Sequence, residues 1–128
     1  MVKLLIGHKG SGKTNQMVQL ANDCIEKGAG SIIFINKNHR LMYELNYKIR
    51  VICMEDFEHI TNIDEYIGFL YGMYSANHDV ECVFIDGILK HANVDLESMP
   101  RFVERLKKIS SQCGIDFYVS ISASKDDL

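Results

Sequence analysis

Eight residues near the start of the chain combine glycines, a lysine and a hydroxyl group at a spacing that can bind phosphate. They are Gly7, His8, Lys9, Gly10, Ser11, Gly12, Lys13 and Thr14. This series fits the Walker A pattern G-x-x-x-x-G-K-[ST], in which the lysine reaches the β- and γ-phosphates and the hydroxyl binds Mg²⁺. Glycines let the backbone N–H groups turn inward onto phosphate oxygens. The alternative is a glycine-rich turn with a solvated lysine.

A second acidic group must accompany such a loop if it is to hold a metal ion. The apolar run "CVFID" ends in Asp86. Ligands of open parallel sheets bind at the carboxyl ends of strands, so Gly7 and Asp86 are expected to face one crevice. The alternative is that Asp86 and Gly87 form an ordinary turn. Together the two motifs predict a nucleoside triphosphate, ATP or alternatively GTP, bound with Mg²⁺ through Thr14 and Asp86.

The elements that must position these motifs alternate along the chain. Five apolar runs, each apolar on both faces, predict strands at 2–6, 31–35, 50–54, 80–85 and 115–122. Helical patterns cover 14–27, 63–76 and about 95–113. This alternation is typical of a mostly parallel sheet with helices on both sides. We therefore expect an α/β fold, a three-layer α/β/α sandwich with a five-stranded sheet, and interpret residues 1–128 as a single nucleotide-binding domain.

Composition restricts the partners and the compartment. The net charge of −3 weighs against sequence-independent binding of nucleic acid, which needs a basic face. No apolar run reaches the length of a membrane span or a signal peptide. The four cysteines lie far apart, without metal-ligand spacing, and are interpreted as reduced core residues. The sequence thus predicts a cytoplasmic protein.

Two helices carry further signals. The helix at 63–76 is apolar on more than one stripe, because Phe69 and Met73 add to the face that contains Leu70. Either this helix is wedged between the sheet and its neighbours, or its second face forms a homo-oligomer. In the last helix, Pro100 fits best if Met99 marks a break and a fresh helix begins with proline in its first turn.

The segments "GHKGSGKT", "VFID" and "RFVERLKKISSQCGIDFYVSIS" together resemble the P-loop NTPases with a core of the RecA and hexameric-helicase type, over most of the chain. The chain is also similar to short uncharacterised bacterial P-loop proteins, some of them labelled PilT-like. The resemblance implies that the last strand lies between the Walker A and Walker B strands. It also implies a catalytic role for Lys13 and a phosphate-sensing role for Ser120 or Ser122.

The chain departs from that family where water is activated. The RecA-type pattern has a glutamate at the end of the second core strand or next to the Walker B aspartate. Here "SIIFI" is followed by residues 36–38, "NKN", and Asp86 by Gly87. An amide can hold a water molecule but cannot take its proton. The nearest carboxylates that can substitute are Glu55 and Asp56, after "VICM", and Glu55 is the candidate base.

These observations leave different classes of function open. The first is an ATPase whose hydrolysis is slow or depends on a partner. The second is a nucleotide-dependent regulator or assembly module that does not turn over. A small phosphotransferase related to thymidine kinase is a further possibility, although the chain has few residues for a lid and an acceptor pocket.

Overall fold

The computed structural model describes residues 1–8, 10–28, 30–37, 43–57, 59–88 and 95–122. The strands are β1 (Val2–Gly7), β2 (Ser31–Asn36), β3 (Arg50–Cys53), β4 (Val80–Ile85) and β5 (Asp116–Ser122). The α-helices are α1 (Lys13–Glu26), α2 (Ile63–Ala76) and α4 (Met99–Cys113). Two 3-10 turns, η1 (Met54–Asp56) and η2 (Leu96–Ser98), follow β3 and precede α4.

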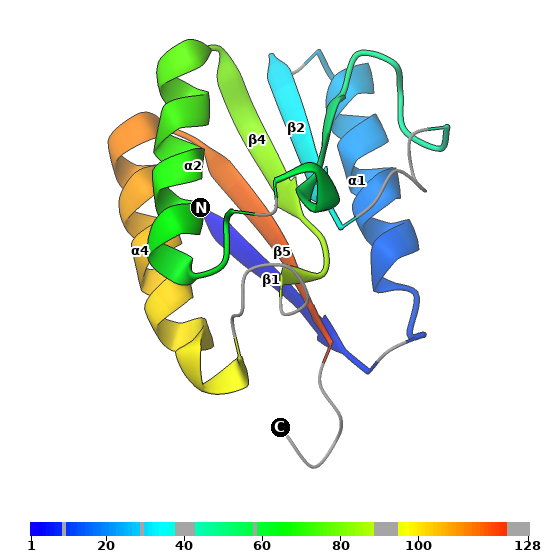
Figure 1. Cartoon of the computed structure of the whole chain (residues 1–128). Coiled ribbons are helices and arrows are strands. Elements are labelled where there is room, and N and C mark those ends of the chain that lie inside the picture. The colour runs from blue at the N-terminus through cyan, green and yellow to red at the C-terminus, as the bar shows by residue number, and fades with distance from the viewer. Residues whose placement is uncertain (9, 29, 38–42, 58, 89–94, 123–128) are drawn as a thin grey trace.

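The five strands form one sheet in the order β1-β5-β4-β2-β3, and every pair of neighbours is parallel. Helix α1 covers one face of the sheet, and α2 and α4 cover the other (Figure 1). This arrangement confirms the predicted α/β/α sandwich. It also confirms that β5 lies between β1 and β4, as the resemblance implied.

The strands sort their side chains onto two cores. In β2, Ile33 and Ile35 join the core under α2 and α4, whereas Ile32 and Phe34 join the core under α1. This alternation is the two-residue period of a strand. Because both faces are covered by helices, the strand is apolar throughout, which is why its sequence reads as an uninterrupted apolar run.

Helix α4 begins and ends as its sequence predicts. Asp95 caps the preceding η2 turn by accepting a hydrogen bond from the Ser98 N–H at 2.8 Å. The α-helix then starts at Met99 with Pro100 in its first turn, where the missing N–H of proline costs no helical hydrogen bond. At the other end Gly114 takes a left-handed conformation, φ 70°, and its N–H bonds to the Ser110 carbonyl.

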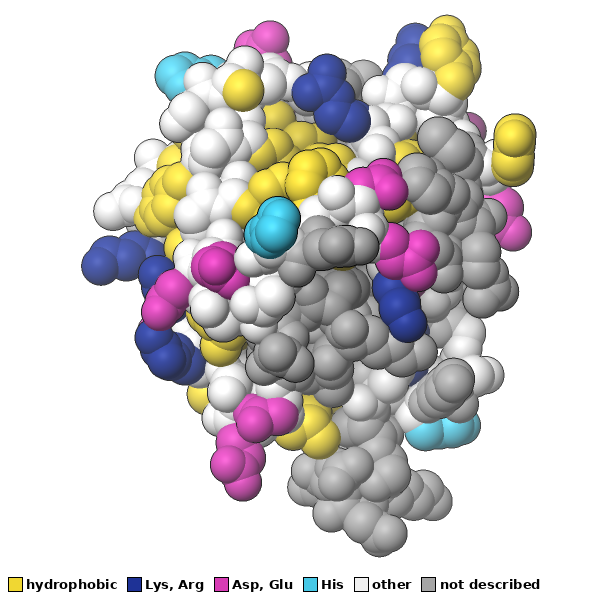
Figure 2. Space-filling model, in the orientation of Figure 1, with side chains coloured by type: hydrophobic (Ala, Val, Ile, Leu, Met, Phe, Trp, Pro, Cys, Tyr) yellow, Lys and Arg dark blue, Asp and Glu magenta, His cyan; other side chains and the backbone are white. Residues whose placement is uncertain are grey.

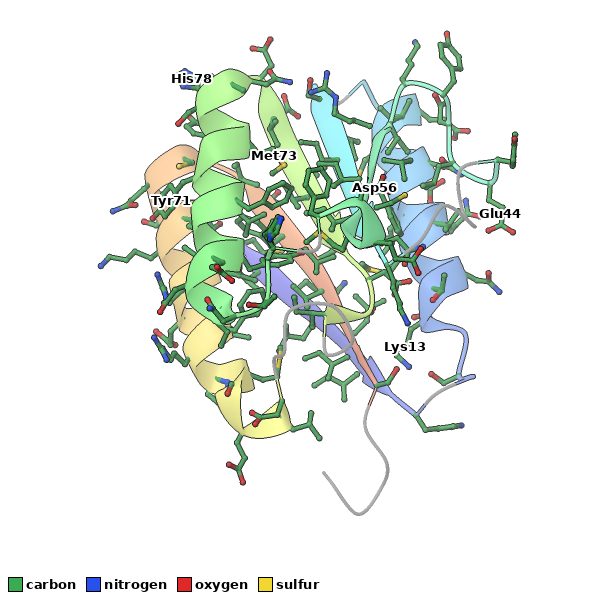
Figure 3. The ribbon with its side chains drawn as sticks, viewed as in Figure 1. Lys13, Glu44, Asp56, Tyr71, Met73 and His78 are labelled. Atoms are coloured by element: carbon green, nitrogen blue, oxygen red, sulfur yellow. The ribbon has the colours of Figure 1, made fainter. Side chains whose placement is uncertain are left out.

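The second apolar stripe of α2 packs within the molecule in part. On the face seen in Figure 2, hydrophobic side chains gather between α2 and the η1 turn. Here the ring of Phe57 lies on that of Phe69, with centroids 5.6 Å apart, and Met73 packs against the core. Tyr71 points away on the opposite side of the helix and donates a hydrogen bond to Gln112 (Figure 3). Self-association through α2 stays a prediction.

Helix α1 and the segment 43–49 together cover one face of the sheet. Leu45 and Ile49, from the segment 43–49 before β3, complete the core under α1. Asn22 of α1 ties this segment down, because its amide donates to the Glu44 carbonyl at 3.1 Å and accepts from the Asn46 N–H at 2.7 Å. Both contacts are made to backbone atoms of the segment.

The buried cysteines follow the expectation from the sequence. Cys53 and Cys82 lie in the cores, and all four cysteines carry free thiols. No helix in the described part of the chain combines the length and the apolar character that crossing a bilayer requires.

The contact between α2 and α4 generates a prediction about stability. Phe102 is fully buried and its ring meets that of Tyr66 edge-on, with centroids 5.7 Å apart. Phe102→Ala removes this packing and leaves a cavity, so the free energy of unfolding should fall by about 3–5 kcal/mol in urea titrations. The exposed Lys108 on the same helix is the control, since Lys108→Ala should change it by less than about 0.5 kcal/mol.

Candidate functional site

The glycine loop joins the carboxyl end of β1 to the first turn of α1. Gly10 and Gly12 take positive φ angles of 86° and 91°, a conformation that residues with a Cβ adopt only with strain. At Gly7 a Cβ would lie 2.7 Å from the Ser11 Oγ. The loop therefore favours glycine at positions 10 and 12 through its backbone angles, and at position 7 a side chain would have to displace the Ser11 hydroxyl.

That N-terminus presents a positive field. Gly12 is the residue before the helix, no side chain caps it, and the first turn of α1 contains no acidic residue. The first N–H groups of a helix have no partner within the helix, and the macrodipole adds a partial positive charge. An anion is the group that suits such a helix end.

Lys13 folds back over the loop in this structure. Its Nζ donates to the carbonyl oxygens of Gly7 at 3.1 Å and of His8 at 2.9 Å, and lies 3.4 Å from the Ser11 Oγ. Figure 3 shows Lys13 at the N-terminal end of α1. The ammonium group is thus already held at the loop, in contact with carbonyl oxygens that carry only partial negative charge.

Three elements meet at the carboxylate of Asp86, directly after β4. The Thr14 hydroxyl, from the first turn of α1, donates to one carboxylate oxygen at 3.1 Å. The Ser120 hydroxyl, from β5, donates to the other at 2.5 Å, and the Gly87 N–H donates to the Ser120 Oγ at 3.2 Å. Asp86 and Ser120 are both buried. The structure therefore brings together the two residues that the sequence assigned to the metal.

The remaining serine of the closing strand lies elsewhere. Ser122 is exposed and stands opposite Gly7 in the register of β5 with β1. Ser120 reaches Asp86 because Val119 pairs with Ile85, which places the next residues of the two strands level with each other. Sequence reasoning named Ser120 and Ser122 as alternatives. Only the strand register shows which of them contacts Asp86.

The carboxylates after β3 stand apart from this cluster. In the sheet, β2 lies between β3 and β4, so β3 runs about 10 Å from β4, two strand spacings away. Burial, followed by the charges of Asp56 and Glu55, raises the pKa of the Cys53 thiol, which places both carboxylates near the end of β3. Figure 3 shows Asp56 in η1, well away from Lys13. The residue beside Asp86 at the end of β2 is Asn36, which is buried.

The other residues of the motif are less informative. His8 follows β1, and its carbonyl oxygen accepts a hydrogen bond from Lys13. Lys9 lies outside the described residues. Among the residues that the structure describes, no group of three or more His, Cys, Asp or Glu side chains gathers in a way that could hold a metal ion.

Comparison with known proteins places the fold but not the activity. No protein-family model matches the chain, and no curated protein sequence matches it. Among solved structures, it is similar to a KaiC-like protein from the hyperthermophilic archaeon Pyrococcus horikoshii, with a TM-score of 0.63 and 18% sequence identity. The match covers 95% of this chain and 61% of that protein, so this chain spans about three fifths of its length. This likeness shows a shared α/β fold over nearly the whole chain.

The cluster at Asp86 generates a test of its own. Ser120→Ala removes a hydrogen bond from a buried carboxylate, so the free energy of unfolding should fall by about 1–3 kcal/mol. Ser122→Ala, two residues further along the same strand and exposed, should change it by less than about 0.5 kcal/mol. Urea unfolding of both variants measures the difference, and equal effects would show that the Ser120 contact contributes no stability.

Proposed function

We propose that this protein binds a nucleoside triphosphate together with Mg²⁺ at the N-terminus of α1. The observation that carries the proposal is the 3.1 Å contact between the Thr14 hydroxyl and the Asp86 carboxylate. It sets two oxygen ligands side by side at the start of a helix that follows a glycine loop. Neither a simple glycine turn nor a turn at Asp86 requires this contact.

The residues at the site suit a polyphosphate. The glycine loop and the uncapped start of α1 supply backbone N–H groups, and Lys13 supplies a full positive charge. Lys13 would have to exchange its carbonyl partners, Gly7 and His8, for phosphate oxygens. A phosphate oxygen carries a larger negative charge than a carbonyl oxygen and attracts the ammonium group more strongly, so the exchange favours binding.

The metal would be held by Thr14 and Asp86. Mg²⁺ prefers oxygen ligands and keeps several water molecules, so one or two protein oxygens with phosphate oxygens are sufficient. Bound there, the ion supplies neutralisation of phosphate charge. Ser120 holds the second Asp86 oxygen, and this keeps the carboxylate turned so that its first oxygen stays beside Thr14.

Hydrolysis is proposed to be slow or dependent on a partner. The position next to Asp86 on β2 carries Asn36, whose amide can orient a water molecule but cannot accept its proton. Glu55 would have to reach the site from the end of β3. A nucleotide-dependent regulator or assembly module without turnover fits the same residues, and the KaiC-like fold does not separate these alternatives. Nothing at the described site favours a phosphotransferase.

Removal of the Lys13 charge is the first test. Lys13→Ala should weaken binding of Mg·ATP about ten- to a hundredfold, because a charge-assisted contact contributes roughly 1.5–3 kcal/mol. Isothermal titration measures the dissociation constant, and thermal shifts with ATP, GTP and ADP identify the preferred ligand, since a ligand of the folded state raises Tm. Lys27→Ala, just beyond the opposite end of α1, is the control. An unchanged dissociation constant in Lys13→Ala would refute the assignment.

Turnover by the isolated protein is the second test. P-loop proteins without an arginine from a partner hydrolyse about 10³–10⁵ times more slowly than with one, so we expect well below about one turnover per minute. Release of phosphate from Mg·ATP measures the rate. Asp86→Asn should weaken the Mg²⁺-dependent part of the affinity. Several turnovers per second, abolished by Glu55→Gln, would instead identify Glu55 as the base and exclude the module without turnover.

A further inference from the structure

Among the described residues, β1 stands at one edge of the sheet. Within the described residues it pairs with β5 alone. The Phe117 N–H donates to the Met1 carbonyl, and backbone groups alternate in direction along a strand, so residues 1, 3, 5 and 7 point toward β5. The N–H and C=O groups of Val2, Leu4 and Ile6 therefore point away from the sheet. Such a row of polar groups is a template for another strand.

The side chains of the same residues open onto an apolar groove beside α4. Leu4 is 36% exposed and Ile6 51% exposed, although both are large apolar residues within a strand. The groove has a volume of about 410 Å³. Its apolar walls are Leu4 and Ile6 of β1, Ile121 of β5, Leu96 of η2 and Met99, Pro100 and Val103 of α4. Apolar side chains exposed together in this way mark a contact surface.

In the described residues, this edge carries few of the features that prevent strands from pairing. Natural edge strands are protected by proline, by bulges, by charged side chains such as lysine, or by a covering helix or loop. β1 contains no proline, and its register with β5 runs from Val2 to Gly7 without a shift. Its one charge, Lys3, belongs to the row of side chains opposite that of Leu4 and Ile6, and so lies away from the groove.

The rim of the groove favours a second copy of this chain as its occupant. Glu104 and Lys107 both line it, with their charged atoms 3.7 Å apart. A rim with one charge of each sign matches itself under a two-fold rotation, which brings the same surface of both copies together. Nucleic acid, by contrast, requires a surface of a single positive sign.

We propose that two copies of the chain pair through β1, antiparallel, so that their sheets become continuous and the groove beside α4 is covered. The outward-pointing residues fix the register, with Leu4 opposite Leu4 of the partner subunit and Val2 opposite Ile6 of the partner subunit. Each of these pairs exchanges two backbone hydrogen bonds. Lys3 then lies opposite Leu5 of the partner subunit, so no like charges face each other directly across the pair.

This pairing reaches the glycine loop. In the same register Gly7, the last residue of β1, lies opposite Met1 of the partner subunit. The Gly7 carbonyl accepts a hydrogen bond from Lys13. Met1 of each copy thus borders the glycine loop of the other, about 10 Å along the strand from the dimer axis at Leu4. The proposal itself rests on the edge and the groove, and not on nucleotide binding.

The register gives a charge-swap experiment. At roughly 50 µM, where a dimer with a micromolar Kd is mostly assembled, light scattering should report twice the 14.6 kDa of one chain. Leu4→Lys places two ammonium groups opposite each other at the axis, and Leu4→Glu places two carboxylates there. Each variant alone should raise the dimer dissociation constant by at least about tenfold. An equal mixture of the two should restore the dimer mass, because opposite charges then meet.

Two controls separate this surface from the face of α2. Met73→Lys changes α2, and the lysine stem can cover the same surface, so the dimer should persist. Melting curves check that each variant is folded. Hydrogen exchange gives a second readout, since the backbone amides at positions 4 and 6 should be protected in the native chain and exchange rapidly in Leu4→Lys. A folded native chain that is monomeric, or a dimer that survives Leu4→Lys, would overturn the proposal, as would a dimer lost in Met73→Lys alone.

Discussion

Asp86 carries its carboxylate at a depth where only 8% of the residue reaches solvent. A charge in such a place needs hydrogen-bond donors, and these come from two other elements, through Thr14 at the start of α1 and Ser120 on β5. The three elements are far apart in the sequence. Their meeting at one carboxylate holds the start of α1 against the ends of β4 and β5, so Thr14 and Asp86 already lie side by side in this structure.

The strand order makes this meeting possible. β5 lies between β1 and β4, and the parallel register sets Ser120 level with Asp86. The first turn of α1 lies on the same face of the sheet as Ser120 and places the Thr14 hydroxyl beside Asp86. Burial of apolar side chains on both faces holds the strands in that register, because a slip by one residue would turn every core side chain to the opposite face.

The sequence predicts the local features well and the neighbours of each strand poorly. The turn of the glycine loop, the apolar runs and the restart of the helix at Pro100 depend on residues close together in the chain, and these elements agree with the structure. Phosphate binding by the loop stays a prediction. The choice between Ser120 and Ser122 depends on register, which periodicity does not contain. The run "VKLLI" predicts a buried strand, yet Leu4 and Ile6 are exposed. The pattern of apolar residues shows which faces of a strand are covered, but it does not show whether the strand lies at the edge of the sheet.

The contacts of Asn22 affect which positions of this protein can be substituted during evolution. Its amide grips the segment 43–49 by the backbone of Glu44 and Asn46, and Leu45 and Ile49 anchor it in the core. Between these anchors Tyr43 and Tyr47 are 98% and 89% exposed. The fold holds the main chain of this segment and not those two side chains. Positions 43 and 47 are therefore free to accept new residue types, and a new surface can evolve there without any change in the sheet beneath it.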